Sequence, residues 1–161
     1  MHILVISDSH GKIDSIPYLL KCYNHKVSTV VHLGDNVQDL LQFQSQYSAI
    51  NFVAVAGNCD FTSHDAPRER LLALGTKKIL LIHGHSHNVK MNYNRLMYYS
   101  LEKEVDACLF GHTHVPEVFR YESVFFMNPG SISEPRGMSK AGYGILTIND
   151  EGNITGELIN L

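Results

Sequence analysis

The sequence lacks several features that would place it outside the ordinary globular proteins. It has no tryptophan, only three cysteines and five prolines, and no apolar run long enough to cross a bilayer. Its net charge of -3 and pI near 6.3 show no excess of positive charge that would favour binding to nucleic acid or to an anionic membrane. Hydrophobic residues make up 44% and charged residues 18% of the 161 residues. This balance predicts one globular domain over residues 1–161.

The cysteines and the N-terminus argue against an exported protein. Cys22, Cys59 and Cys108 are odd in number and widely scattered, with no Cys-x-x-Cys pair, so a disulfide framework is not expected. The chain also enters an apolar stretch at Ile3 with no basic segment before it, which is typical of a first strand rather than a signal peptide. A reducing cytoplasm is therefore the predicted location.

Short apolar runs rich in valine and isoleucine recur in the first two thirds of the chain. They do not alternate with polar residues, which is typical of strands buried on both faces. Helical spacing of apolar residues predicts helices between some of these runs. The predicted strands cover 3–6, 29–33, 52–56, 79–82 and 107–110, and the predicted helices cover 12–25, 37–47 and 90–104.

The pattern changes at about residue 115, where consecutive strands joined by turns are predicted without helices between them. These strands cover 115–121, 124–128, 144–148 and 154–159. A β-α-β series followed by mostly antiparallel strands predicts an α/β (α+β) fold. Two mixed sheets packed together, with helices on the outside, accommodate both parts.

Polar residues follow each of the five early apolar runs. In an open α/β sheet the carboxyl ends of the strands share one edge, where binding sites form. Glycine within or beside these polar segments lets the chain turn sharply and lets backbone approach a ligand. The segments are 7–10 (Ser-Asp-Ser-His), 34–36 (Gly-Asp-Asn), 57–60 (Gly-Asn-Cys-Asp), 83–87 (His-Gly-His-Ser-His) and 111–114 (Gly-His-Thr-His).

The side chains in these segments are typical metal ligands. Imidazole, carboxylate and amide oxygen suit Mn, Fe, Zn or Co. The cysteines are not clustered in the sequence, which argues against a structural zinc or iron–sulfur site. Seven ligands are too many for one ion with open positions, but they suit two ions about 3.5–4 Å apart that share a carboxylate. Asp and Asn after a strand are alternatively turn formers or helix caps. The seven candidates are Asp8, His10, Asp35, Asn58, His83, His112 and His114.

In this order the five segments resemble the calcineurin-like metallophosphoesterase superfamily. The small, single-domain YfcE-like phosphodiesterases of bacteria and archaea are the branch most similar to this chain. The resemblance covers nearly the whole sequence, including 128–131 (Asn-Pro-Gly-Ser) and 135–137 (Pro-Arg-Gly). It implies a four-layer αββα sandwich.

The resemblance also implies roles for the seven ligands. Asp8, His10 and His114 would hold one ion, Asn58, His83 and His112 the other, and Asp35 would bridge the two. Manganese is the preferred metal, with Zn, Ni, Fe or Mg as alternatives. The implied reaction is hydrolysis of a small phosphate ester, preferably a diester, by a hydroxide that the two ions activate.

One position departs from the pattern of many relatives, which carry a histidine where Cys59 stands. That histidine is thought to protonate the leaving group, and a thiol with a pKa of about 8.5 is a poorer acid. His85 is the candidate replacement, and His85 and Asn58 are the candidate catalytic residues. Arg136 and Cys59 are candidate contacts for the substrate. Specificity is expected from the loops at 61–70, 86–95 and 131–141.

The main alternative is a catalytically idle scaffold, as in the retromer subunit of the same superfamily. His10 favours an enzyme, because it preserves the full ligand set of the first metal, from which the scaffold protein departs. A nuclease is disfavoured, because nuclease relatives carry capping domains and basic surfaces. The aromatic stretch at 93–99 is compatible with a homo-oligomer interface or with core packing.

Overall fold

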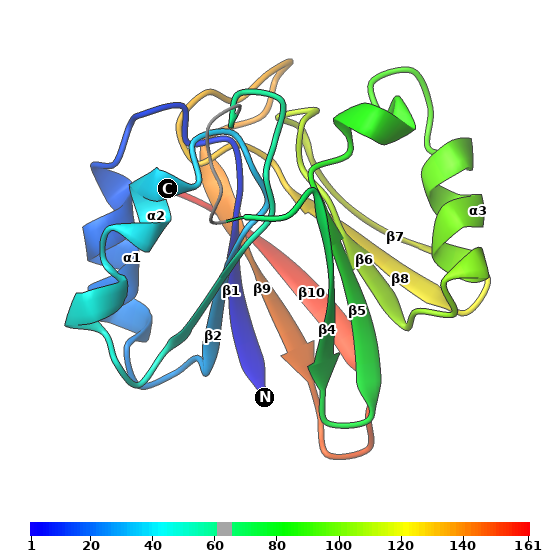
Figure 1. Ribbon diagram of the computed structural model, residues 1–161, viewed down its shortest axis with the longest axis horizontal. Helices are drawn as coiled ribbons and strands as arrows, with labels where there is room; N and C mark the ends of the chain where they lie inside the picture. Colours follow the sequence, from blue (N-terminus) through cyan, green and yellow to red (C-terminus); the bar gives the residue numbers. More distant parts are fainter. Residues whose placement is uncertain (61–65) are drawn as a thin grey trace.

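The computed structural model describes residues 1–60 and 66–161, and it shows two five-stranded sheets packed face to face (Figure 1). Helices α1 (Ser15–Tyr23) and α2 (Gln38–Leu41) cover the outer side of one sheet, and α3 (Asn94–Glu102) covers the outer side of the other. The predicted four-layer αββα sandwich with two mixed sheets is confirmed.

The first sheet has the strand order β10-β9-β1-β2-β3. Its strands are β1 (His2–Ile6), β2 (Thr29–His32), β3 (Asn51–Ala54), β9 (Gly142–Ile148) and β10 (Ile154–Asn160). Strands β1, β2 and β3 are parallel, whereas β9 is antiparallel to both β1 and β10. The β-α-β part of the chain therefore shares its sheet with the last hairpin.

The second sheet has the strand order β4-β5-β6-β8-β7. Its strands are β4 (Glu69–Leu74), β5 (Lys77–Ile82), β6 (Ala107–Leu109), β7 (Pro116–Tyr121) and β8 (Val124–Pro129). Strands β5, β6 and β8 are parallel, and the edge strands β4 and β7 are antiparallel to their neighbours. The strands after residue 115 are thus divided between the two sheets, with β7 and β8 in one and β9 and β10 in the other.

Strand β1 explains why the early apolar runs do not alternate with polar residues. Ile3 and Val5 pack into the core between the two sheets, whereas Leu4 and Ile6 pack against the helices on the outer side. Strand β5 has the same arrangement, with one face in the central core and the other toward α3. Both faces are buried, as the composition of these runs predicts.

The helices are shorter than predicted. Helix α1 occupies 15–23 of the predicted 12–25, with Pro17 in its first turn, where its missing amide hydrogen costs little. The predicted helix over 37–47 was wrong as one element: α2 ends at Leu41 and a separate 3₁₀ turn, η1, covers Gln44–Gln46. Helix α3 occupies 94–102 of the predicted 90–104, after a 3₁₀ turn, η2, at His85–His87.

Strand β4 was not predicted, and Glu69 and Arg70, which were assigned to a loop at 61–70, lie within it. The part of that loop at 61–65 lies outside the described residues.

In the stretch at 93–99, Tyr93, Met97 and Tyr99 pack around a core that includes Leu96, so core packing accounts for most of its apolar character. Among the described helices, none has the length and hydropathy needed to span a membrane.

Candidate metal centre

The seven predicted ligands come together where the carboxyl ends of strands from both sheets meet. The ligands that follow β1, β2 and β3 come from the first sheet, and the ligands that follow β5 and β6 come from the second. Ligand atoms of Asp8, His10, Asp35 and His114 lie within 4.8 Å of one another, and so do those of Asp35, His83 and His112. Asp35 belongs to both groups. The strand ends thus share one edge of the molecule, although they come from two sheets and not from one.

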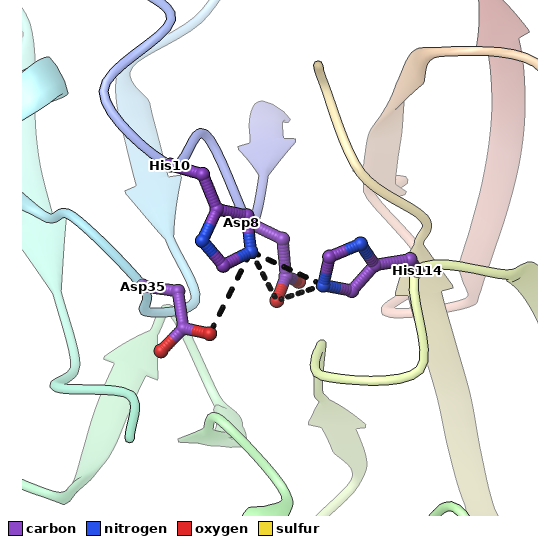
Figure 2. A group of neighbouring side chains, drawn as sticks. All are labelled: Asp8, His10, Asp35 and His114. Carbon is purple, nitrogen blue, oxygen red and sulfur yellow. Dashed lines mark hydrogen bonds and ion pairs between the residues drawn. The ribbon is translucent and has the colours of Figure 1, made fainter. Parts of the chain in front are cut away.

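The first group surrounds a small space between two histidines and two carboxylates (Figure 2). The Nε2 atom of His10 lies 3.2 Å from Nε2 of His114 and 3.7 Å from Oδ2 of Asp35. The Nε2 atom of His114 lies 3.2 Å from Oδ1 of Asp8. Four ligand atoms therefore face one another from three different loops.

The second group adjoins the first through Asp35. The Nε2 atom of His83 lies 3.5 Å from Oδ2 of Asp35 and 3.1 Å from Nδ1 of His112. The same nitrogen lies 3.2 Å from Oδ1 of Asn58, which brings the amide into this group. All seven predicted ligands therefore contribute an atom to two adjacent clusters.

Backbone carbonyls set the orientation of two of these histidines. Nδ1 of His83 donates to the carbonyl oxygen of Leu33 at 2.7 Å, and Nδ1 of His114 donates to that of Glu134 at 2.6 Å. Each ring, when neutral, then presents the lone pair of Nε2 to the cluster. Within residues 1–60 and 66–161, Oδ1 of Asp8, which faces His114, is buried and has no hydrogen-bond partner. Lone pairs that face one another in a buried site call for a cation, so these residues fit a metal centre.

Electrostatics holds both carboxylates and His112 in forms that bind metal. Burial alone would raise the pKa of Asp35, but the hydrogen bond and charge of His83 and the amide of Cys59 bring it far below its usual range. The pKa of Asp8 is also lowered, because His114, His83 and Ser7 outweigh its burial. Burial and the neighbouring His83 lower the pKa of His112 to about 4. At neutral pH both carboxylates are ionised and His112 is neutral, as metal ligation requires. Burial alone would lower the pKa of His83 and His114, but the carboxylates of Asp35 and Asp8 raise it, so at these two rings a metal competes with a proton.

The backbone is strained at most of these ligands. Positive φ angles, which cost of order 1–3 kcal/mol at non-glycine residues, occur at five of the seven: Asp8 (55°), His10 (48°), Asp35 (62°), His112 (68°) and His114 (61°). Close approach explains two of the adjacent glycines. A Cβ on Gly57 would collide with the Asp35 carboxylate, and one on Gly111 would collide with Ser7. The glycines therefore let the ligand loops touch.

Asp60 ties two of the ligand loops together, a role that sequence reasoning missed. Its Oδ2 accepts from the amides of Asp35 and Gly57, both at 2.7 Å. Its Oδ1 accepts from the amides of Asn36 and Val37 at 2.9 and 3.0 Å. Asp60 stands in the fourth position of the segment Gly-Asn-Cys-Asp, which is the one signal in the sequence that could have pointed to it.

A buried network supports the loop that carries Asp8 and His10. Nδ1 of His32 accepts from the amide of Gly34, so Nε2 carries the hydrogen and donates to Oγ of Ser9 at 2.9 Å. Oγ of Ser9 donates in turn to Oδ2 of Asp39 at 2.7 Å. His32 is fully buried, and that burial lowers its pKa to about 4. On the other side of the loop, Oγ of Ser131 donates to the Asp8 carbonyl at 2.7 Å.

The remaining predicted site residues lie around the metal ligands. The His85 ring is 5.3 Å from the His83 ring and 6.0 Å from the His112 ring, measured between centroids. Cys59 is exposed, and Nδ2 of Asn58 lies 3.3 Å from its sulfur. The Arg136 side chain is exposed, and its backbone amide donates to the His114 carbonyl at 3.2 Å.

Residues 1–151 match the Calcineurin-like phosphoesterase superfamily domain. The chain belongs to this superfamily. The resemblance inferred from the five segments is thereby confirmed, and the match covers every proposed ligand.

Curated members of the superfamily align over most of their length. The "Probable metallophosphoesterase YsnB" of Bacillus subtilis is 34% identical over 152 residues, covering 94% of this chain and 86% of the relative. The "Phosphodiesterase YfcE" of Escherichia coli K12 is 30% identical over 194 residues, covering 99% of each. These two relatives place the chain in the YfcE/YsnB-like branch, a branch of metal-dependent phosphoesterases.

Two solved structures have the same fold. A predicted phosphoesterase from Streptococcus pneumoniae superposes with a TM-score of 0.80 at 35% identity, over 92% of this chain and 83% of the other. Vps29 of Entamoeba histolytica in complex with zinc superposes with a TM-score of 0.78 at 24% identity, over 98% and 97%. The second likeness concerns the fold alone.

Proposed function

We propose that this chain hydrolyses phosphodiesters at a centre of two divalent metal ions. The observation that carries the proposal is that two adjacent clusters of ligand atoms share the carboxylate of Asp35. A shared carboxylate between two sets of ligands is the arrangement that two-metal hydrolases use. The YfcE relative, whose name is that of a phosphodiesterase, supports a diester over a monoester.

In this proposal Asp8, His10 and His114 hold one ion, and Asn58, His83 and His112 hold the other. Three of the seven donors are oxygens, from two carboxylates and an amide, and such donors suit manganese. Zn, Ni, Fe and Mg are the alternatives to compare, and a zinc complex is known for the structurally similar Vps29. When bound, the two ions supply charge neutralisation for the phosphate and lower the pKa of water.

The chain's own groups orient the substrate around that centre. His83 and His114 are fixed by the carbonyls of Leu33 and Glu134, so they do not reorganise when a ligand enters. We propose that Asn58 contacts the reacting phosphate, that Cys59 and Arg136 contact the substrate at the rim, and that His85 lies at the leaving group. Burial lowers the pKa of His85. A neutral imidazole donates a hydrogen bond but is a weak source of a full proton, which favours substrates with good leaving groups.

The test is hydrolysis of a nitrophenyl phosphodiester and the matching monoester by metal-stripped protein reloaded with Mn, Zn, Ni, Fe or Mg. We expect metal-dependent turnover that favours the diester and is lost in Asp35→Asn. An unchanged rate in His85→Ala would remove His85 from the leaving-group role. Binding of two ions without turnover on either substrate would contradict the enzyme and leave a scaffold as the function.

The same proposal includes a small phosphate ester as the partner and the cytoplasm as the location. All three cysteines are free, which fits a reducing compartment. Thiol titration of protein from freshly lysed cells, compared with an exported control protein, tests the location.

A further inference from the structure

A cavity of about 560 Å³ opens beside the metal ligands, on the side of Asn58. Its described walls combine three apolar residues with four polar ones, so the cavity offers both carbon contacts and hydrogen-bonding groups. The lining residues are Ala56, Gly57, Asn58, Asp60, Ala66, Pro67, Arg68 and His85. Because Asn58 also belongs to the ligand cluster, a phosphate at that cluster would have one ester arm next to this cavity.

The described lining of the cavity holds one carboxylate, Asp60, and one guanidinium, Arg68. Asp60 is an acidic residue of its lining, but its two oxygens already accept four backbone amides. Among the described lining residues, the cationic side chain is that of Arg68. No carboxylate within 1–60 or 66–161 forms an ion pair with it. Among the described lining residues, the oxygens of Asp60 are thus occupied by backbone amides, whereas the guanidinium of Arg68 has no ion-pair partner and can bind an anionic group.

Backbone contacts fix the position from which Arg68 extends. The carbonyl of the preceding residue, Pro67, accepts from the amide of Ala56 at 2.8 Å, just beyond β3. Ala66 is 7% exposed and packs with Val37 and Ala56, and β4 begins directly after Arg68. Arg68 is thus presented from an anchored backbone, although its side chain is exposed.

We propose that this cavity binds the second ester arm of the phosphodiester and that Arg68 selects an arm carrying its own negative charge, a carboxylate or a phosphate. A guanidinium pairs with either group through two parallel hydrogen bonds, and such charge-assisted bonds are stronger than neutral ones. The apolar walls formed by Ala56, Ala66 and Pro67 accommodate the carbon chain between the two anionic groups. Arg68 is in this view a specificity-determining residue, and the inference rests on the proposed function.

The experiment compares two nitrophenyl phosphodiesters that differ only in the second arm, carboxyethyl or its neutral isostere carbamoylethyl. Both release nitrophenolate, so the chemistry at the leaving group is the same. We expect the metal-loaded protein to prefer the carboxyethyl ester by about tenfold in kcat/KM, as for one charge-assisted contact. Arg68→Met should lower kcat/KM for the carboxyethyl ester to about that for the carbamoylethyl ester and so abolish the preference, and Arg68→Lys should retain part of it.

Arg95→Met is the matched control, because it removes the same charge from an exposed position of α3 outside the cavity. Calorimetry with the products carboxyethyl phosphate and carbamoylethyl phosphate measures the same preference without turnover. Equal kcat/KM values for the two esters in the unmodified protein would overturn the inference, and so would an equal fall in kcat/KM for both esters in Arg68→Met. Either result would leave the proposed phosphodiesterase activity unaffected. Selective binding of carboxyethyl phosphate without hydrolysis of either diester would contradict the proposed function and retain the anionic subsite.

Discussion

At the scale of single residues, the side chains that build the centre divide into ligands and supports. The ligands follow strands in short segments whose composition already suggests metal chemistry. The supports are ordinary polar residues whose partners come from other loops, as with Asp60 and the amides of Asp35 and Gly57. Sequence reasoning finds the first kind through residue type and spacing. It misses the second, because four amides converge on Asp60 only after β2 and β3 lie side by side.

Asp60→Asn tests this supporting role. An amide keeps one acceptor oxygen but turns its NH₂ group toward two backbone N–H donors, so the loop carrying Asp35 should shift. Loss of such a support typically costs roughly 10–100-fold in metal affinity, and we expect a fall of that size in a competition titration with a chromogenic chelator. Activity should return at saturating metal.

Asp14→Asn is the control, since it removes the same charge from an exposed site at the start of α1. A metal affinity in Asp60→Asn equal to that of the control would contradict the positioning role. In that case Asp60→Asn would change only the stability of the metal-free protein and not its affinity for metal.

His32 gives a prediction about pH. Burial lowers its pKa from 6.5 to about 4 in the folded protein, so the unfolded chain binds the extra proton first. Stability from this group is therefore present above pH 6.5 and is lost as pH falls toward 4. Between pH 7 and 5 the loss is roughly 2 kcal/mol.

His32→Gln keeps an acceptor for Gly34 and a donor for Ser9 but does not titrate. Urea unfolding of metal-free protein at both pH values should show a smaller pH-dependent loss in this variant than in the unmodified chain. Identical losses in the two proteins would mean that other groups account for the acid sensitivity.

At the scale of elements, the described strands were predicted with the exception of β4, and the partly exposed edge strands β7 and β10 were among those predicted. β1 and β5 contain continuous apolar runs, 3–6 and 79–82, and both were predicted within two residues of their observed bounds. β4 alternates between exposed and half-buried positions, with Leu71 47% exposed, because it is an edge strand. The segment at 37–47 has apolar residues at helical spacing, but only Gln38–Leu41 forms the α-helix.

Packing between the two sheets depends on small residues in the last hairpin. A Cβ on Gly156 of β10 would lie 2.5 Å from Cε of Met127 and 2.8 Å from Cζ of Phe125, both on β8. Overpacking of this kind typically costs 1–3 kcal/mol. We expect Gly156→Ala to lower the free energy of unfolding by about 2 kcal/mol while two ions still bind.

The exposed neighbour Thr155→Ala, on the same strand, is the comparison, and it should leave the free energy nearly unchanged. Chemical denaturation gives the stabilities, and metal analysis of the purified proteins gives the ion content. Equal stabilities of the two variants would show that the sheets adjust to the added methyl group.

At the scale of the whole molecule, the centre lies across the junction between the sheets. The sequence places polar segments at strand ends, and parallel strands in one sheet would suffice to bring them together. In the structure Asp35 and its neighbours come from the first sheet, whereas His83 and His112 come from the second. Local patterns do not specify which strands share a sheet, because pairing depends on contacts between segments far apart in the chain. The pairing of β1 with β9 is an example. The convergence of the ligands was therefore predictable, but its placement between two sheets was not.

This placement makes metal a link between the two halves of the sandwich. Oδ1 of Asp8 is buried without a hydrogen-bond partner among the described residues and faces His114 from the other sheet, so an unsatisfied carboxylate oxygen lies at the junction. A ligand that binds only the folded state stabilises it by about 2.7 kcal/mol per site at a concentration about 100 times Kd. In a domain of this size each kcal/mol raises Tm by about 2–4 °C. Chelation should therefore lower Tm by several degrees, and reloading should restore it.

Asp35→Asn should lose most of this metal-dependent shift, because its carboxylate serves both clusters. Asp150→Asn, which removes the same charge from an exposed turn between β9 and β10, should keep the full shift. Thermal unfolding followed by circular dichroism, with and without metal, compares the three proteins. If metal raised Tm equally in all three, the ions would bind elsewhere, and the junction between the sheets would not be the metal centre.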